Sequence, residues 1–265
     1  MYDEDTTLYY LQSRYYDPTT GRFINADDTA FIGSSGTAIG DNIYTYCEND
    51  PVNNVDYTGQ WFHNLAAYRD YHKKRCKGHA WRSFLTKYKN VNERYNFNKK
   101  TCGSYRNYIL GQGLNPVSNM VYGASRRLIS NVGCELIAVY NALKWLGHYQ
   151  SFSQVILEAE MNDLPWFNGR FGTDPKDLYL YFKAHNIKYK KYEKLDEFRK
   201  KMRHSKVGII SQWNKRCIDG LHTFFIFRKK GKYYAYNYYN DSRKREEIDL
   251  YKINSKKFII GYCFI

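Results

Sequence analysis

The chain has 265 residues, of which 43% are hydrophobic, and it carries 41 Lys and Arg against 26 Asp and Glu, a formal net charge of +15. This apolar content is sufficient for a buried core, and the charge favours nucleic acid, anionic membrane or an acidic protein as a partner without choosing among them. No apolar run reaches the roughly 18 to 20 residues that span a bilayer, and the acidic start lacks the basic region of a signal peptide.

The cysteines are scattered, without the spacing of a disulfide scaffold or a paired zinc site, and we expect thiols. One cluster, His72, Cys76 and His79 with His63 further away, could supply zinc ligands. Lys and Arg crowd it and would oppose a cation. The sequence therefore predicts no metal and no cofactor.

Residues 1–59 differ from the rest of the chain in being rich in Asp, Thr, Gly, Tyr and Asn, with turn signals between short aromatic runs. This pattern predicts strands joined by tight turns. Residues 7–23, TLYYLQSRYYDPTTGRF, resemble the signature that closes the core of Rhs/YD-repeat proteins. Residues 42–59, with NIYTY and NDPVNNVDYTG, are similar to the end of the same core.

The resemblance implies a β-rich remnant of a carrier core that delivers a variable C-terminal toxin. In that family a β-strand shell encloses the toxin, and self-cleavage at its end frees it. Asp27 and Asp56 fall where the family places its cleavage aspartates, although Tyr57 replaces the motif's proline. The alternative is that both aspartates are ordinary turn residues.

Residues 60–125 form a polar, aromatic and basic connector to which the sequence assigns no chemistry. A helical pattern covers roughly residues 61–85, and loop signals follow at 111–113 and 115–116.

Residues 126–265 change from helical to strand periodicity along the chain. We expect helices over 131–147, 153–161, 178–184 and 195–204, and strands over 207–213, 222–228, 233–238 and 257–265. Helices followed by an antiparallel sheet predict an α+β domain.

Cys134 is the candidate nucleophile. We expect it in the first turn of a helix that Asn131 caps, where the helix dipole would favour a thiolate and free N–H groups could stabilise an oxyanion. His222, at the start of a strand, is the candidate acid/base. Asn237, on the return strand of the hairpin, is placed to orient it.

The order of Cys134, His222 and Asn237 resembles papain-like cysteine peptidases, particularly the bacteriocin-processing group. This resemblance covers about half the chain and implies a papain-like cysteine hydrolase domain. The group usually has Gln six residues before the nucleophile, where this chain has Leu128; Asn131 or Ser130 are the substitute oxyanion candidates.

Structural roles compete with these assignments. Cys134 could be a buried apolar side chain, His222 a core histidine and Asn237 a turn residue, while Cys217 is a competing thiol in a loop. The three residues together favour catalysis over these separate explanations.

The resulting prediction is a polymorphic toxin that acts as a cysteine protease or deamidase on a target-cell protein. Its segments are a core remnant over 1–59, the connector over 60–125 and the toxin domain over 126–265. One alternative is a nuclease toxin that uses His148, His185 or His204 with nearby Lys or Glu residues. The other is a toxin that binds its target without chemistry.

The family resemblance also implies how the chain reaches its target. We expect a carrier or secretion system to deliver it into a competing cell, because the chain shows no signal peptide or transmembrane segment. An acidic immunity protein would protect the producer by matching the positive charge. Nucleic acid is a possible partner that this interpretation does not favour.

Overall fold

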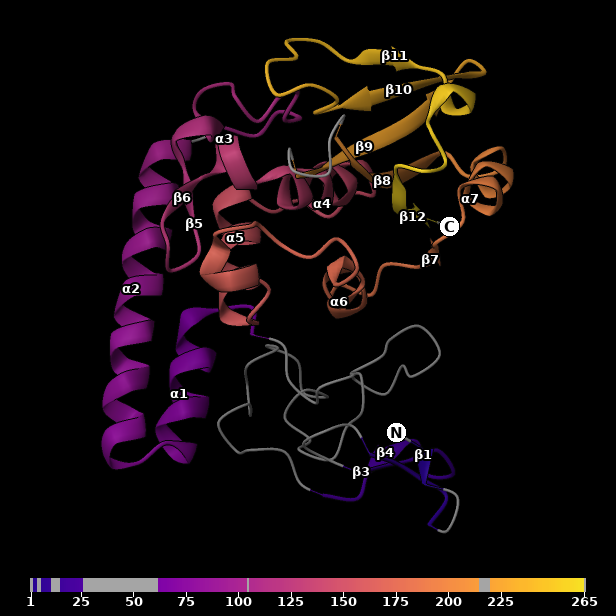
Figure 1. Cartoon of the computed structure of the whole chain (residues 1–265). Coiled ribbons are helices and arrows are strands. Elements are labelled where there is room, and N and C mark those ends of the chain that lie inside the picture. The colour runs from indigo at the N-terminus through magenta and orange to yellow at the C-terminus, as the bar shows by residue number, and fades with distance from the viewer. Residues whose placement is uncertain are drawn as a thin grey trace. The chain divides into compact units, whose positions relative to one another are not determined.

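A computed structural model describes residues 2–3, 6–10, 15–25, 62–103, 105–214 and 220–264 of the chain (Figure 1). The chain divides into two compact units. The first comprises residues 1–89 and 182–187, and the second comprises 90–181 and 188–265.

The N-terminal segment of the first unit contains an antiparallel four-stranded meander. Its strands are β1 (Tyr2–Asp3), β2 (Leu8–Tyr10), β3 (Tyr15–Asp17) and β4 (Arg22–Phe23). The carboxylate of Asp17 accepts a hydrogen bond from the backbone N–H of Thr19 at 2.8 Å and closes the turn. This confirms strands and tight turns for the part of the segment that the structure describes; Asp27 and Asp56 lie outside the described residues.

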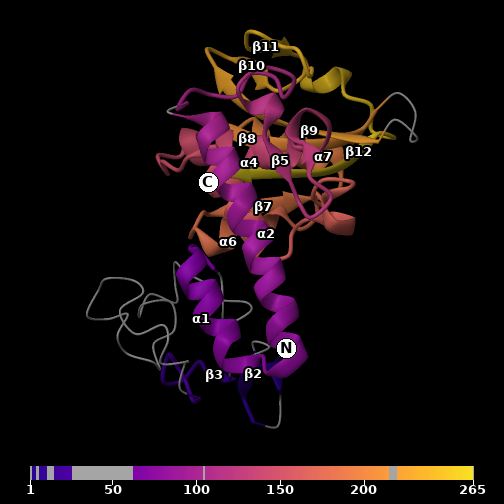
Figure 2. The same ribbon diagram turned by 90° about the vertical axis from the view of Figure 1, so that its left-hand side faces the viewer.

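Two helices follow, α1 (Leu65–Arg75) and α2 (Gly78–Cys102) (Figure 2). The side chain of Asn64 caps α1 by accepting from the backbone N–H of Ala67. Tyr68 of α1 packs edge-on against Phe84 of α2, with ring centroids 5.2 Å apart. The second helix is longer than the sequence pattern predicted, and the boundary between the two units falls inside it.

The second unit is built on a six-stranded antiparallel sheet with strand order β11-β10-β9-β8-β12-β7. The strands are β7 (Tyr189–Tyr192), β8 (Val207–Trp213), β9 (Leu221–Lys229), β10 (Lys232–Tyr236), β11 (Glu246–Ile248) and β12 (Phe258–Phe264). A separate short hairpin joins β5 (Val121–Tyr122) to β6 (Arg127–Leu128).

Of the helices that follow α2, α4 and α7 pack against the strands of the large sheet. The helices are α3 (Ile129–Val132), α4 (Cys134–Trp145), α5 (Phe152–Met161), α6 (Leu178–Ala184) and α7 (Leu195–Met202), with short 3-10 turns η3 (Val117–Asn119), η4 (Trp166–Gly169) and η6 (Leu250–Lys252). Among the described residues, no helix is both long and apolar enough to cross a bilayer.

The alternation of side chains along β9 determines which helix each residue meets. Phe225 and Phe227 contact Trp145 at the end of α4. Phe224 and Ile226 belong instead to an apolar cluster that includes α7 residues. Because successive strand residues point to opposite faces, α4 and α7 cover opposite sides of the sheet.

The α+β architecture confirms the coarse prediction, whereas a papain-like fold is not shown. Strands β7 and β11 were not predicted from sequence. Both are edge strands with charged side chains, and such strands lack the apolar alternation that identifies a half-buried strand.

Candidate nucleic-acid interface

The predicted nucleophile, Cys134, is the first residue of α4, as expected, but its thiol is buried. Its sulfur donates to Oε1 of Glu135 at 3.2 Å. Burial, reinforced by the neighbouring carboxylate, raises the pKa of the Cys134 thiol well above its usual value. The thiol is therefore held in its neutral form, which is the poorer nucleophile.

Glu135 sits at the centre of a buried polar network. Its Oε1 also accepts from the Thr223 hydroxyl at 3.2 Å, and that hydroxyl lies 2.8 Å from the Ser211 hydroxyl. Desolvation raises the pKa of Glu135 to about 7. Gly172 makes room for the carboxyl group, because a Cβ there would lie 3.1 Å from Oε2 and 2.8 Å from a backbone oxygen.

His222 and Asn237 are brought together, but not through their side chains. The Nε2 of His222 lies 2.6 Å from the backbone oxygen of Asn237. The Asn237 side chain instead accepts from the backbone N–H of Gln112, in the loop at 111–113, at 2.8 Å. Burial lowers the pKa of His222, so the imidazole favours its neutral form.

The side chains of Thr223 and His222, which are neighbours on β9, have different contacts. Thr223 directs its hydroxyl toward Glu135 in the first turn of α4. The ring centroid of His222, the preceding residue of β9, lies 6.1 Å from that of Phe224. The catalytic pairing of Cys134 with His222 stays a prediction.

The two oxyanion candidates also have other roles. Asn131 lies inside the short helix α3, and Gly133 occupies the N-cap position of α4, so the prediction that Asn131 caps the Cys134 helix is wrong. The backbone oxygen of Ser130 accepts from the Gln112 side chain at 2.8 Å.

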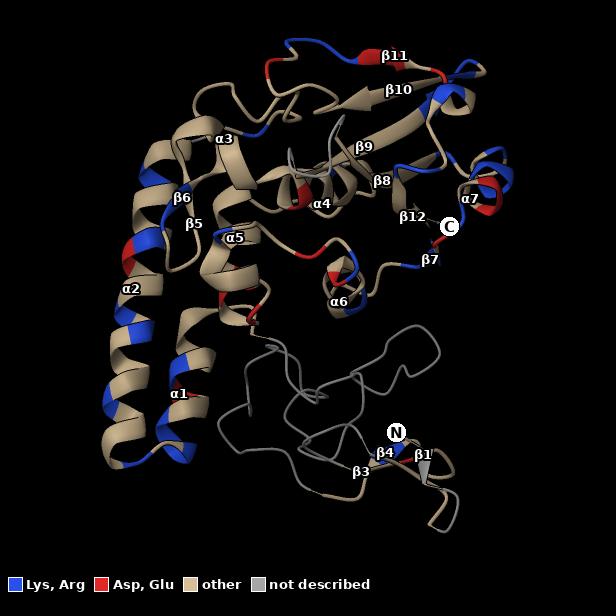
Figure 3. Ribbon diagram, viewed as in Figure 1, with Lys and Arg blue, Asp and Glu red and all other residues tan. Residues whose placement is uncertain are grey.

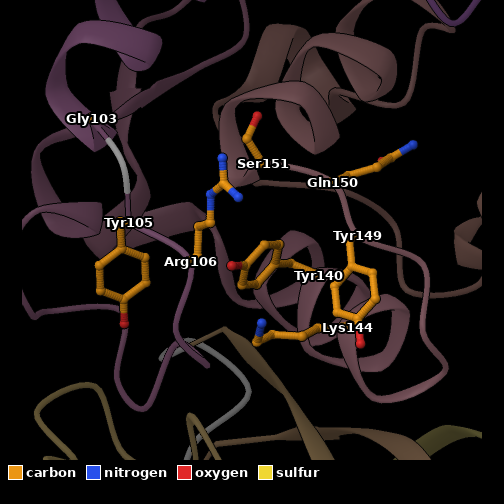
Figure 4. A pocket seen from close by; sticks show the side chains of 8 residues that line it. All are labelled: Gly103, Tyr105, Arg106, Tyr140, Lys144, Tyr149, Gln150 and Ser151. Carbon is orange, nitrogen blue, oxygen red and sulfur yellow. The ribbon is translucent and has the colours of Figure 1, made fainter.

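Two hollows flank the C-terminal end of α4. The first, called here the Tyr149 hollow, has a volume of about 310 Å³ and is lined by Gly103, Tyr105, Arg106, Tyr140, Lys144, Tyr149, Gln150 and Ser151. Figure 4 shows the side chains of Arg106 and Lys144 among the rings of Tyr105, Tyr140 and Tyr149. Tyr149 is 81% exposed, and the Lys144 ammonium lies 5.6 Å from its ring centroid.

The second, the His204 hollow, has a volume of about 410 Å³ and is lined by Trp145, Leu146, Lys201, His204, Ser205, Lys206, Val207 and Phe264. His204 and Lys206 are exposed, while Trp145 packs on Phe227 with centroids 4.7 Å apart. Sequence reasoning had named His204 only within the nuclease alternative. No Asp or Glu is among the described residues that line either hollow, so both present cations and aromatic rings to a ligand.

Two of the possible zinc ligands, His72 of α1 and Cys76 at its C-cap, lie close to each other. The sulfur of Cys76 lies 3.7 Å from Nδ1 of His72, and the His72 ring stacks on Phe84 with centroids 4.2 Å apart. His72 is thus part of the aromatic packing between α1 and α2.

Comparison with known proteins finds relatives over part of the chain. The tRNA nuclease WapA of Bacillus subtilis (strain 168) is 38% identical over 114 residues, which are 38% of this chain and 5% of that protein. The tRNA3(Ser)-specific nuclease WapA of Bacillus spizizenii is 43% identical over 90 residues, 31% of this chain and 4% of that protein. The tRNA(Glu)-specific nuclease WapA of Bacillus subtilis subsp. natto is 49% identical over 61 residues, 23% of this chain and 2% of that protein.

The chain therefore spans at most 5% of the length of these three relatives. No family model matches the chain, and no solved structure matches it significantly.

These relatives correct the predicted reaction. All three are named as nucleases that act on tRNA, whereas the sequence predicted a cysteine protease or deamidase that acts on a protein; that prediction of enzyme class is wrong. Burial of the Cys134 thiol, which raises its pKa, also disfavours the thiolate that a cysteine hydrolase needs. The findings favour the nuclease alternative.

Proposed function

We propose that this protein is a nuclease toxin that cleaves RNA, with transfer RNA as the substrate class. The observation that carries the proposal is the likeness to three proteins named as tRNA nucleases. The net charge of +15 supports it, because a cationic protein attracts the phosphate backbone. Figure 3 shows Lys and Arg recurring on α1, α2 and α7.

The His204 hollow is the proposed reaction centre, because it combines an exposed imidazole with the ammonium groups of Lys201 and Lys206. Cleavage by the adjacent 2′-hydroxyl forms a bond from the 2′-oxygen to phosphorus and breaks the bond to the 5′-oxygen. His204 accepts the 2′-hydroxyl proton, and the lysines neutralise charge on the phosphoryl oxygens. The protonated His204 then gives this proton to the departing 5′-oxygen.

The Tyr149 hollow is the proposed binding site for a neighbouring nucleotide. Arg106 and Lys144 would contact phosphate, and the exposed Tyr149 ring offers a stacking surface for a base. Lys144 and Trp145 are consecutive residues of α4, so one RNA strand that crosses the end of this helix meets both hollows.

The resemblance of residues 1–59 to an Rhs core supports delivery of the nuclease by a larger carrier. Within this proposal, an acidic immunity protein that covers the cationic hollows would protect the producing cell.

The test is incubation of the purified chain with total tRNA, with cleavage followed by gel electrophoresis and end mapping. We expect cut tRNA, and a loss of about 100-fold or more in rate for His204→Ala, because general acid–base catalysis contributes about 10² to 10⁴. His79→Ala, which removes an exposed histidine on α2, is the matched control. Intact tRNA with the parent chain would refute the nuclease, and full activity of His204→Ala would refute the assigned centre.

A further inference from the structure

A loop of the second unit exposes three aromatic side chains at its tip. Trp166, Phe167 and Phe171 are 46%, 64% and 58% exposed, and their ring centroids lie 5.4 to 5.9 Å from one another. This group, called here the aromatic platform, is separate from both hollows at the end of α4. A contiguous group of exposed apolar side chains, unlike single exposed rings, is typical of an interaction site.

The base of the loop is held by hydrogen bonds. Pro165 and Thr173 form an isolated antiparallel bridge, and the N–H of Trp166 donates to the oxygen of Gly172 at 2.8 Å. The Thr173 hydroxyl lies 2.8 Å from the buried hydroxyl of Tyr122. The rings are therefore displayed from a fixed base.

The tip of the loop has a strained backbone. Phe167 has φ 47° and ψ 53°, and Asn168 has φ 59° and ψ 26°, both in the left-handed region that side chains rarely adopt. Such strain persists where the surrounding structure enforces it and is common at ligand sites. At Phe167 its effect is to turn a large ring toward solvent.

A buried ion pair secures the neighbouring hairpin. Arg94 of α2 donates to both carboxylate oxygens of Glu160, and Glu160 accepts the N–H of Gly123 at 2.8 Å. Gly123 and Gly169 approach so closely that a Cβ on Gly169 would lie 2.8 Å from the Cα of Gly123. The ion pair thus fixes the hairpin against which the aromatic loop rests.

The platform borders a hollow of about 410 Å³ that combines rings with polar and cationic groups. It is lined by Ala124, Ser125, Phe167, Asn168, Arg170 and Phe171. The exposed side chains of Arg126 and Arg127 lie on the same hairpin as Ala124 and Ser125. An aromatic wall, a guanidinium, an amide and a hydroxyl are the groups with which proteins stack unpaired bases and bind their edges.

We propose that the aromatic platform binds unpaired bases of an RNA loop. The inference rests on the proposed function and deepens it, because it selects folded RNA with single-stranded loops over uniform duplex. The concave shape and the amide and hydroxyl groups favour a nucleobase over a lipid surface, which would need only rings and cations. The bases of double-stranded RNA would not stack on the platform, because they stay stacked on one another inside the duplex.

The test measures binding rather than cleavage, by fluorescence anisotropy of a labelled 2′-O-methyl RNA stem-loop. This probe lacks the 2′-hydroxyl nucleophile, so its binding is independent of the proposed reaction. The comparison probe is a blunt duplex with the same stem. We expect Phe167→Ala/Phe171→Ala to weaken stem-loop binding by about tenfold or more, since each stacked base contributes substantially, and to leave duplex binding unchanged.

Tyr239→Ala is the matched control, because it removes a ring that is 57% exposed elsewhere in the second unit. Phe167→Leu/Phe171→Leu separates stacking from apolar contact, and we expect it to lose stem-loop binding as the alanine variant does.

The proposal is overturned if the parent chain does not prefer the stem-loop, if the alanine variant loses duplex binding equally, or if the leucine variant binds like the parent. Loss of binding to anionic vesicles in the alanine variant, with stem-loop binding intact, would assign the platform to a membrane surface instead. A chain that binds the stem-loop but does not cut tRNA would refute the proposed function and leave this inference standing.

Discussion

In the first turn of α4, burial raises the pKa of two neighbouring side chains, Cys134 and Glu135. Cys134 has the position along the helix that a reactive thiol requires, yet its thiol is buried and donates to Glu135, which also accepts from the hydroxyl of Thr223. Because the thiol and the carboxyl group are both buried, each favours its neutral form. The network therefore serves the core of the second unit.

Thiol reactivity tests this description of Cys134. We expect Cys134 in the folded protein to react with iodoacetamide far more slowly than Cys76, because Cys134 is buried with a raised thiol pKa whereas Cys76 is partly exposed. Peptide mass spectrometry after timed labelling at pH 7.5 measures both rates in one sample. Equal or faster labelling of Cys134 would contradict the buried, neutral thiol.

The raised pKa of Glu135 predicts that the free energy of unfolding falls as the pH rises. Its pKa in the folded chain, about 7, lies above the ordinary value of 4.5, so the folded state binds more protons between these values. The stabilisation is fully present below about pH 4.5 and is lost as the pH rises through 7, in total about 3.5 kcal/mol at about 1.4 kcal/mol per pKa unit.

Urea unfolding of the parent and of Glu135→Gln at pH 5 and pH 8 measures this contribution. We expect the parent to lose more stability than the variant over that range, by about 2.5 kcal/mol. A difference between parent and variant that does not change with pH would show that Glu135 titrates alike in both states.

At the scale of elements, α2, α5 and the β5–β6 hairpin are joined by one buried ion pair. The side chains of Arg94 and Glu160 are 6% and 3% exposed, and Glu160 also holds the hairpin through Gly123. Removal of one partner leaves the other charge buried and unpaired, which is costlier than removal of both.

Arg94→Met is therefore expected to lower the free energy of unfolding by about 3 to 5 kcal/mol, and Arg94→Met/Glu160→Met by less. The measurement is urea denaturation of the two variants and the parent. If the double variant loses about twice as much free energy of unfolding as Arg94→Met alone, the two charges are not coupled.

For the whole molecule, the charge of +15 predicts RNA binding that depends strongly on salt. Each phosphate contact contributes a slope of about −0.7 to a plot of log binding constant against log salt concentration for single strands. We expect Arg106→Ala and Lys144→Ala each to reduce the slope by about that amount, measured by anisotropy titrations between 50 and 200 mM salt. Lys89→Ala, outside the second unit, is the control, and an unchanged slope in both hollow variants would remove the Tyr149 hollow from the interface.

The sequence by itself determined the α+β class, and its predicted helices and central strands correspond closely to α4 to α7 and to β8, β9, β10 and β12. These elements were predictable because periodicity reports which side of an element is apolar. The edge strands β7 and β11 and the full length of α2 were missed, because charged surface residues carry no such signal.

Only the tertiary structure decided what the chemically suggestive residues contact. Cys134, His222 and Asn237 have the order of a catalytic triad, but the structure buries the Cys134 thiol and places Nε2 of His222 against the backbone oxygen of Asn237. The two hollows at the end of α4 and the hollow beside the aromatic platform each combine residues that are distant in sequence, such as Trp145 with His204 and Ser125 with Phe171. The spacing of residues along the chain determines on which face of a helix or strand each side chain lies. The packing of helices and strands determines which of these faces come into contact.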